Sequence, residues 1–180
     1  MSPAWKRFPP RPSELGHTFL CIARDARGRL LWRARLRNHL SNEGVLDVLG
    51  QIYRAVGAPY GANLYVGLYN TTPLPTDTLS TLTSFEMSGN GYARVAWARG
   101  TTDWGAPAIL PTGEGETLGV AKNFTASGGS IGPFTYLVLA TTSDNSGHTV
   151  AYAPFSSAMT ITNGTSLAVT PRARLRGVTS

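Results

Sequence analysis

The pattern nearest to a catalytic motif lies at residues 128–132 (GGSIG), which match the G-x-S-x-G nucleophile elbow around Ser130. Asp144 and His148 follow in the chain order that such hydrolases use. An elbow needs a strand, a turn and a helix within an α/β sheet, whereas Pro133 and a β-pattern follow this serine. The short separation from Ser130 to His148 also leaves no room for crossover helices. A turn between two strands explains the same letters, so a hydrolase using Ser130 is kept only as a distant alternative.

The acidic side chains of residues 61–168 offer no converging pair for acid–base chemistry. They are Asp77, Glu86, Asp103, Glu114, Glu116 and Asp144. All lie in predicted loops, so we interpret them as solvated charges, although a glycosidase pair stays formally open. The one cysteine, Cys21, has no disulfide partner, no Cys/His spacing fits zinc, and no nucleotide-binding fingerprint occurs. We therefore expect no catalytic, cofactor-binding or metal-binding residues, no cofactor, and a protein that is not an enzyme.

Two rows of arginines are candidates for binding. They alternate along predicted strands and comprise Arg29, Arg33, Arg35 and Arg37, and Arg172, Arg174 and Arg176. The planar guanidinium fork suits carboxylates and phosphates. Trp32 falls on the opposite face of its strand, so the aromatics expected on a nucleic-acid surface are missing there. Three interpretations stay open: a solvated strand face, contact with an acidic protein surface and, least favoured, nucleic acid.

Trp104 is a candidate contact residue of another kind. It lies in a predicted loop over residues 100–116 that is rich in Thr, Gly and Pro. The other aromatics recur at the period of strands and are expected in the core. A tryptophan in such a loop either anchors a contact between subunits or covers the core, and both interpretations stay open.

The composition of the 180-residue chain favours many short strands joined by turns. Gly (20), Pro (12), Thr (21) and Ser (14) form over a third of the residues, whereas charged residues form only 14%. Alternating patterns predict a hairpin over 18–37 around a turn at 25–28. Further strands are expected near 63–70, 92–99, 118–125, 134–142, 148–153, 158–162 and 166–175, with loops over 70–90 and 100–116 and a hairpin turn at Asn163 and Gly164. We predict a mainly β fold, an antiparallel β-sandwich of jelly-roll type.

One α-helix is predicted over about 42–56. Ser41 is a suitable N-cap, apolar side chains recur at helical spacing, and Gly57 and Pro59 end the pattern. Residues 1–16 are rich in proline and are expected to form an extended arm. The expected division is an arm over 1–16 and a single β-sandwich domain over 17–180, which includes the hairpin 18–37 and the helix.

The net charge of +6 is unevenly distributed. Residues 1–60 carry ten Lys/Arg against four Asp/Glu, residues 61–168 carry three against six, and the last twelve residues add three arginines. Basic ends indicate contact with an acidic surface. No apolar run is long enough to span a bilayer, and the apolar stretch 19–23 is too short for a signal-peptide core. We expect a protein that is made in a cytosol and has no membrane partner.

Three short motifs occur in order along residues 18–100. The first is the run 24–46 (RDARGRLLWRARLRNHLSNEGVL), which contains Asp-x-x-Gly, a predicted strand with Trp, and Ser-x-Glu-Gly at the start of a predicted helix. The second is YVGLYN at 65–70, and the third is GYARVAW at 91–97. This pattern resembles a family of small tailed-phage virion structural proteins of the capsid-decoration or head-associated kind. The predicted C-terminal strands match that family only in the spacing of strands and turns. The resemblance implies a virion component and supplies no active-site residues.

These observations predict a non-enzymatic capsid decoration (cement) protein, made in the host cytoplasm, that binds and stabilises the outer head shell through many weak contacts. The expected partners are the major capsid protein or other virion proteins and further copies of the chain, with a trimer favoured. Expected contact residues are Arg33, Arg35 and Arg37 of the first row, Arg172, Arg174 and Arg176 of the second, Trp104 and, in the arm, Trp5, Lys6, Arg7, Phe8 and Arg11. The alternative is a tail, head-fibre or adaptor component, including a receptor-binding module in which Trp104 or Tyr69 stacks on a sugar.

Overall fold

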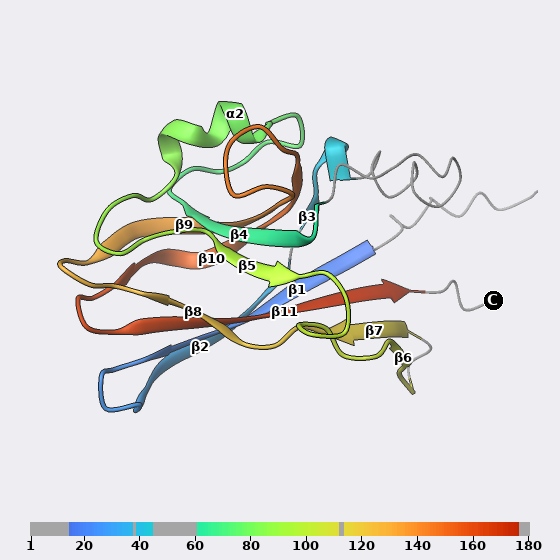
Figure 1. Ribbon diagram of the computed structural model, residues 1–180, viewed down its shortest axis with the longest axis horizontal. Helices are drawn as coiled ribbons and strands as arrows, with labels where there is room; N and C mark the ends of the chain where they lie inside the picture. Colours follow the sequence, from blue (N-terminus) through green and yellow to red (C-terminus); the bar gives the residue numbers. More distant parts are fainter. Residues whose placement is uncertain (1–14, 38, 45–60, 112–113, 177–180) are drawn as a thin grey trace, which may run out of the picture.

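The computed structural model describes residues 15–37, 39–44, 61–111 and 114–176. In this part of the chain two antiparallel sheets pack against each other as a β-sandwich (Figure 1). The predicted mainly β antiparallel sandwich is therefore confirmed, while its jelly-roll wrapping and its division into an arm and one domain stay predictions. Residues 42–44 are helical, at the start of the helix expected over 42–56, and the rest of that helix lies outside the described residues.

The first sheet, sheet A, has the strand order β2-β1-β11-β7-β6, with β8 beside another stretch of β11. Its strands are β1 Leu15–Arg24, β2 Leu30–Arg37, β6 Ala108–Ile109, β7 Glu114–Leu118, β8 Lys122–Thr125 and β11 Ser166–Arg176. The predicted hairpin is confirmed, because β1 and β2 pair antiparallel. In its turn, Asp25 Oδ1 accepts the backbone N–H groups of Arg27 and Arg29, both at 2.9 Å. β1 begins at Leu15, inside the stretch expected to be the arm.

The second sheet, sheet B, has the order β3-β10-β9-β4-β5. Its strands are β3 His39–Leu40, β4 Asn63–Tyr69, β5 Val95–Ala98, β9 Ile131–Ala140 and β10 Thr149–Ile161. The connection between β4 and β5 contains the helix α2 Leu79–Leu82 and the short 3-10 helix η1 Thr83–Phe85. Thr78 and Thr81 cap α2 reciprocally, side chain to backbone. Among the described residues, no helix has the length and apolar character needed to cross a membrane.

Several predicted boundaries differ from the structure. The expected loop 100–116 contains β6 and the start of β7, because residues of β7 pair with the distant strand β11. The strands expected over 148–153 and 158–162 form one bent strand, β10. The turn at Gly164 has the positive φ of +75° that an Asn-Gly turn requires, yet it links β10 of sheet B to β11 of sheet A. The prediction of a hairpin at this turn was therefore wrong, because local turn chemistry does not choose the partner of each strand.

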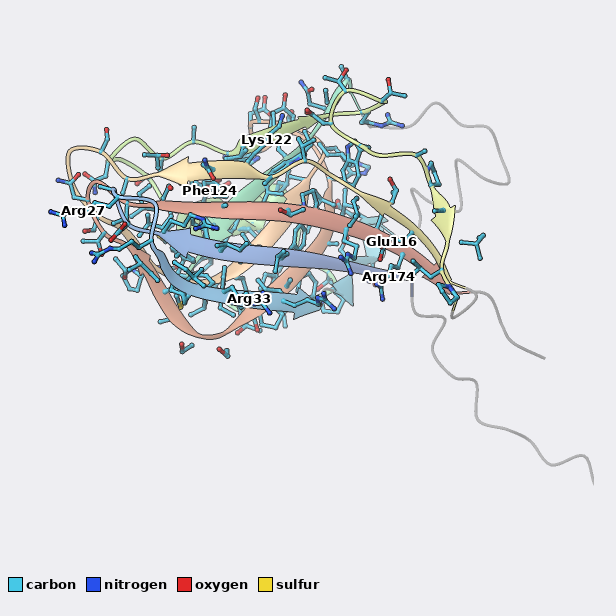
Figure 2. The ribbon with its side chains drawn as sticks, turned by 90° about the horizontal axis from the view of Figure 1, so that it is seen from below. Arg27, Arg33, Glu116, Lys122, Phe124 and Arg174 are labelled. Carbon is cyan, nitrogen blue, oxygen red and sulfur yellow. The ribbon has the colours of Figure 1, made fainter. Side chains whose placement is uncertain are left out.

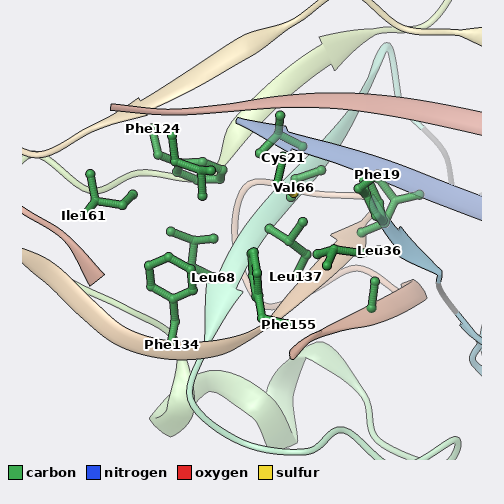
Figure 3. Close-up of a cluster of buried hydrophobic side chains, with 14 of the residues drawn as sticks. Phe19, Cys21, Leu36, Val66, Leu68, Phe124, Phe134, Leu137, Phe155 and Ile161 are labelled. Atoms are coloured by element: carbon green, nitrogen blue, oxygen red, sulfur yellow. The ribbon is translucent and has the colours of Figure 1, made fainter. Parts of the chain in front are cut away.

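The main core fills the space between the two sheets (Figure 3). Phe19 and Cys21 of sheet A face Leu68, Phe134 and Leu137 of sheet B, and each of these is nearly inaccessible to solvent. Burial raises the pKa of the Cys21 thiol, which therefore packs as a neutral apolar group.

A second apolar cluster covers the other face of sheet B. It lies beneath α2 and consists of Tyr69, Leu79, Leu82, Val138, Ala140 and Tyr152. Sheet B is therefore covered on both faces. No described element covers the outer face of sheet A, which forms the lower side of the molecule in Figure 1.

Candidate functional site

Arginines from both ends of the sequence lie on the outer face of sheet A. In antiparallel sheets, directly opposed residues point to the same face. Arg35 of β2 lies opposite Leu20 of β1, and Leu20 lies opposite Thr170 of β11. Arg172, two residues along β11, therefore shares the face of Arg35, as do Arg33 and Arg174 by the same alternation. Figure 2 shows Arg33 and Arg174 on this sheet.

The positive charge of the β11 row (Arg172, Arg174 and Arg176) is partly neutralised by a carboxylate of the neighbouring strand. Glu116 of β7 accepts the Nε–H of Arg174 at 2.5 Å, and its Oε2 lies 3.4 Å from Nε of Arg172. The Arg172 and Arg174 side chains are 21% and 31% exposed, and the Glu116 side chain is 11% exposed. One carboxylate shared by two guanidinium groups leaves this row with a net positive charge.

The β2 row carries uncompensated charge. Arg33 and Arg35 are exposed, and neither guanidinium group forms an ion pair or a side-chain hydrogen bond in the described part of the chain. The strand register also places Arg37 in line with Thr18 and Arg172. The outer face of sheet A, defined here by the β2 and β11 rows, is therefore a basic surface on rigid strands.

The remaining predicted contact residues lie elsewhere or outside the described chain. Trp104 is partly buried and packs against the main core, beside the β-bridge that it makes with Gly119. The arm residues Trp5, Lys6, Arg7, Phe8 and Arg11 lie outside the described residues. So do the side chains of Arg37 and Arg176.

Ser130 does not meet His148. Ser130 immediately precedes β9 and His148 immediately precedes β10, and these strands pair with Ile131 opposite Ile161 and Ala140 opposite Thr149. The serine and the histidine therefore lie at opposite ends of the strand pair, roughly 30 Å apart at about 3.3 Å per residue. The Ser130 hydroxyl instead accepts the backbone N–H of Asn163 at 3.3 Å. No cluster of metal-ligating side chains occurs among the residues that the structure describes.

The interpretation of the middle carboxylates as solvated loop charges was wrong for Glu116, described above, and also for Glu86 and Asp103. The Glu86 side chain is 14% exposed, and both its oxygens accept hydrogen bonds from the guanidinium of Arg94, which is 3% exposed. The hydroxyl of Tyr92 donates to Glu86 Oε1 at 2.7 Å and accepts the backbone N–H of Leu68 at 3.0 Å. Desolvation, with the adjacent Glu86 charge, raises the pKa of Tyr92 and keeps it a hydrogen-bond donor.

Arg94 also fixes the loop between β9 and β10. Its guanidinium donates to the backbone oxygens of Thr142 and Asp144 and to Asn145 Oδ1, the last at 2.6 Å. It further donates to the hydroxyl of Tyr69 at 3.0 Å. The segment GYAR at 91–94 therefore has a structural role, because Tyr92 and Arg94, two residues apart, both donate hydrogen bonds to the Glu86 carboxylate. We call Tyr69, Glu86, Tyr92 and Arg94 the buried charge cluster.

Asp103 is another carboxylate that the structure removes from solvent. It is 7% exposed, and its Oδ2 accepts the backbone N–H of Ala98 and the Nζ–H of Lys122, both at 2.6 Å. The hydrogen bond from Lys122 and that from Ala98 hold the pKa of Asp103 below its usual value. Neither Lys122 nor Asp103 carries a sequence signal for this pairing, because the contact joins the connection after β5 to the first residue of β8.

The described chain thus has a basic, uncovered sheet face and a set of charges that tie its loops together, and its Ser130, Asp144 and His148 do not converge. This architecture is that of an antiparallel β-sandwich protein with one exposed basic face. The model of the family described as podophage GP4 fiber I protein gp80 matches residues 27–174. Since the match spans most of the sequence, the chain belongs to this family and is a bacteriophage virion structural protein, which confirms the resemblance to phage virion proteins. No curated protein and no solved structure matches the chain.

Proposed function

We propose that this protein is a non-enzymatic attachment component of a phage fibre, which binds an acidic surface of another virion protein through the outer face of sheet A. The observation that carries the proposal is the convergence of the β2 and β11 arginine rows on one uncovered face. Exposed guanidinium groups on a rigid sheet form charge-assisted hydrogen bonds with carboxylates. The family description, which names a fibre protein, supports the fibre assignment.

An acidic protein fits this face better than nucleic acid does. Trp32 points into the sandwich, where its ring meets Phe155 edge to face at 6.1 Å between centroids. The outer face of sheet A carries no aromatic side chain among its described residues, so it offers bases nothing to stack on. Partly exposed Leu20 and Ile22 lie beside the arginines instead. A mixture of apolar contact and arginine is typical of protein–protein interfaces.

Capsid decoration is the second candidate function, because the same face would also suit repeated contact with a capsid lattice on the exterior of the head. The two roles differ in copy number. Quantitative mass spectrometry of purified virions against the major capsid protein separates them: a few copies, in multiples of three, six or twelve, support the fibre role. Hundreds of copies support decoration, and absence from the particle contradicts both.

The attachment proposal extends to segments that flank the sandwich. The arm residues Trp5, Lys6, Arg7, Phe8 and Arg11 and the C-terminal Arg176 are proposed as further contacts, in a cyclic oligomer such as a trimer. Trp104 lies within the sandwich, between β5 and β6, and is proposed as a further contact because it is only partly buried. Deletion of residues 1–14 leaves β1 intact, since β1 begins at Leu15. We expect the deletion to weaken incorporation into particles and to leave the circular dichroism spectrum unchanged. If the truncated protein were incorporated into particles as well as the full chain, the arm would not be part of the attachment surface.

Charge reversal tests the face itself. Arg35→Glu replaces an attraction with a repulsion, and we expect incorporation into virions to fall by about tenfold or more. Arg27→Glu is the matched control, because Arg27 is also exposed but lies in the turn between β1 and β2. Equal incorporation of the two variants would contradict attachment through the outer face of sheet A.

A further inference from the structure

Different contacts join the two sheets along the two long sides of the sandwich. On the side of β5 and β8, side chains join the two sheets: the Trp97 indole Nε1–H donates to the backbone oxygen of Val120 at 2.8 Å. Lys122 Nζ donates to the backbone oxygen of Ala96 at 2.7 Å. On the opposite side the ring of Trp32 of β2 meets the ring of Phe155 of β10, and the sheet ends there: β2 is the terminal strand of sheet A and pairs with β1 alone among the described residues.

β2 is a long edge strand. It has eight residues, whereas strands average about five or six. Alternate residues of an edge strand direct their backbone N–H and C=O groups away from the sheet, where another strand can pair with them. The register with β1 shifts at Ala23 and Arg24, so the regular part of the edge is residues 32–37. At its start Leu30 and Leu31 are each 55% exposed, which adds apolar surface to the edge.

The side chains of this edge determine what can pair with it. Arg33 and Arg35 are exposed and form no ion pair within the described residues. A second copy of β2 placed against the first would bring arginines near arginines, and like charges on neighbouring strands destabilise a sheet. An extended segment with a carboxylate at every second position would instead place opposite charges across from these arginines.

We propose that β2 is a strand-addition site that takes an extended acidic segment of a neighbouring virion protein into sheet A. This deepens the proposed function, on which it rests, by naming the mode of attachment and the chemistry of the partner. The segment forms main-chain hydrogen bonds with residues 32–37 and places alternate carboxylates beside Arg33 and Arg35. Main-chain bonds provide affinity, and the charged side chains select the acidic partner.

The test uses the full chain and capped seven-residue peptides. The probe peptide alternates valine and glutamate; one control replaces glutamate with lysine, and a second carries N-methyl groups on the amides of one edge. Hydrogen exchange of the β2 amides is measured by NMR with and without each peptide. We expect the acidic peptide to slow exchange at alternate residues of 32–37, and both controls to bind at least about tenfold more weakly. Arg33→Glu should weaken binding of the acidic peptide by a similar factor, and Arg27→Glu should not.

The outcomes separate this inference from the proposed function. Binding of the acidic peptide without protection of β2, or equal binding of the N-methylated peptide, would overturn strand addition. Absence of peptide binding, or protection of β2 by self-association of the protein alone, would also overturn it. The proposed attachment face is judged separately, by incorporation of Arg35→Glu into virions: normal incorporation contradicts that face whatever the peptides do.

Discussion

The guanidinium of Arg94 binds both oxygens of Glu86, with Nε 2.7 Å from Oε1 and Nη2 2.6 Å from Oε2. Bidentate pairs of this kind are the strongest of the charge-assisted hydrogen bonds. The pair lies where β4, the connection before β5 and the β9–β10 loop meet, so one ion pair fixes segments that are far apart in the sequence.

Removal of either partner should destabilise the protein strongly, because it leaves a desolvated charge without compensation. We expect Arg94→Ala to lower the free energy of unfolding by about 3–5 kcal/mol, as measured by urea denaturation. Arg29→Ala is the control: Arg29 pairs with Asp25 at 2.7 Å, but its side chain is 72% exposed, so its loss should cost less than about 1 kcal/mol. Similar losses for the two variants would show that the buried charge cluster contributes no more than a surface pair.

Gly67 of β4 should be intolerant of even one added carbon. A Cβ there would lie 2.8 Å from Cε2 of Tyr69 and 3.1 Å from both Glu86 Oε1 and the Tyr92 hydroxyl. We expect Gly67→Ala to displace the buried charge cluster and to cost about 1–3 kcal/mol in urea denaturation. Gly61→Ala lies just before the same strand; apart from its chain neighbours, no atom of the described residues lies within 4 Å of the added Cβ, so the variant should be close to neutral. Equal stability of the two variants would contradict the packing of the cluster over Gly67.

The Asp103–Lys122 pair should make stability depend on acidity. The pKa of Asp103 is lower in the folded protein than its usual value near 4, chiefly through the Lys122 hydrogen bond. Its contribution is therefore fully present above about pH 4 and is lost as the pH falls through the folded pKa. We expect Asp103→Asn to unfold at lower urea than wild type at about pH 7, with a smaller difference at about pH 3. Lys122→Met should reduce the acid dependence in the same way, and a pH-independent difference would show that the ionised carboxylate is not the stabilising form.

The GGSIG segment should behave as a structural turn. We expect Ser130→Ala to change the free energy of unfolding by less than about 0.5 kcal/mol and to leave incorporation into virions unchanged. Gly132→Ala should be clearly destabilising, because its φ is +138° and its Cβ would lie 2.8 Å from the backbone oxygen of Met159. Loss of virion assembly or infectivity in a stably folded Ser130→Ala protein would restore the hydrolase alternative.

The local features of this fold could be predicted from the sequence because neighbouring residues encode them. Alternation along residues 29–37, together with Asp25 and Gly28 between two apolar runs, defined the β1–β2 hairpin. The abundance of Gly, Pro and Thr indicated a mainly β chain, and the arginine rows were visible as basic stripes. The motif GYAR was also recognisable, although it did not identify Glu86 as the shared hydrogen-bond partner of Tyr92 and Arg94.

Only the tertiary structure decided which distant segments lie together. It placed the β2 and β11 arginines on one face, because β1 pairs with both strands in registers that no local pattern specifies. It assigned the strands on either side of Gly164 to different sheets, and it buried Glu86 and Asp103. The physical reason is common to these cases. Turns and strand alternation arise from contacts between residues close in sequence, whereas sheet order and ion pairing depend on the packing of the whole sandwich, in which each long-range contact is possible only once the others have formed.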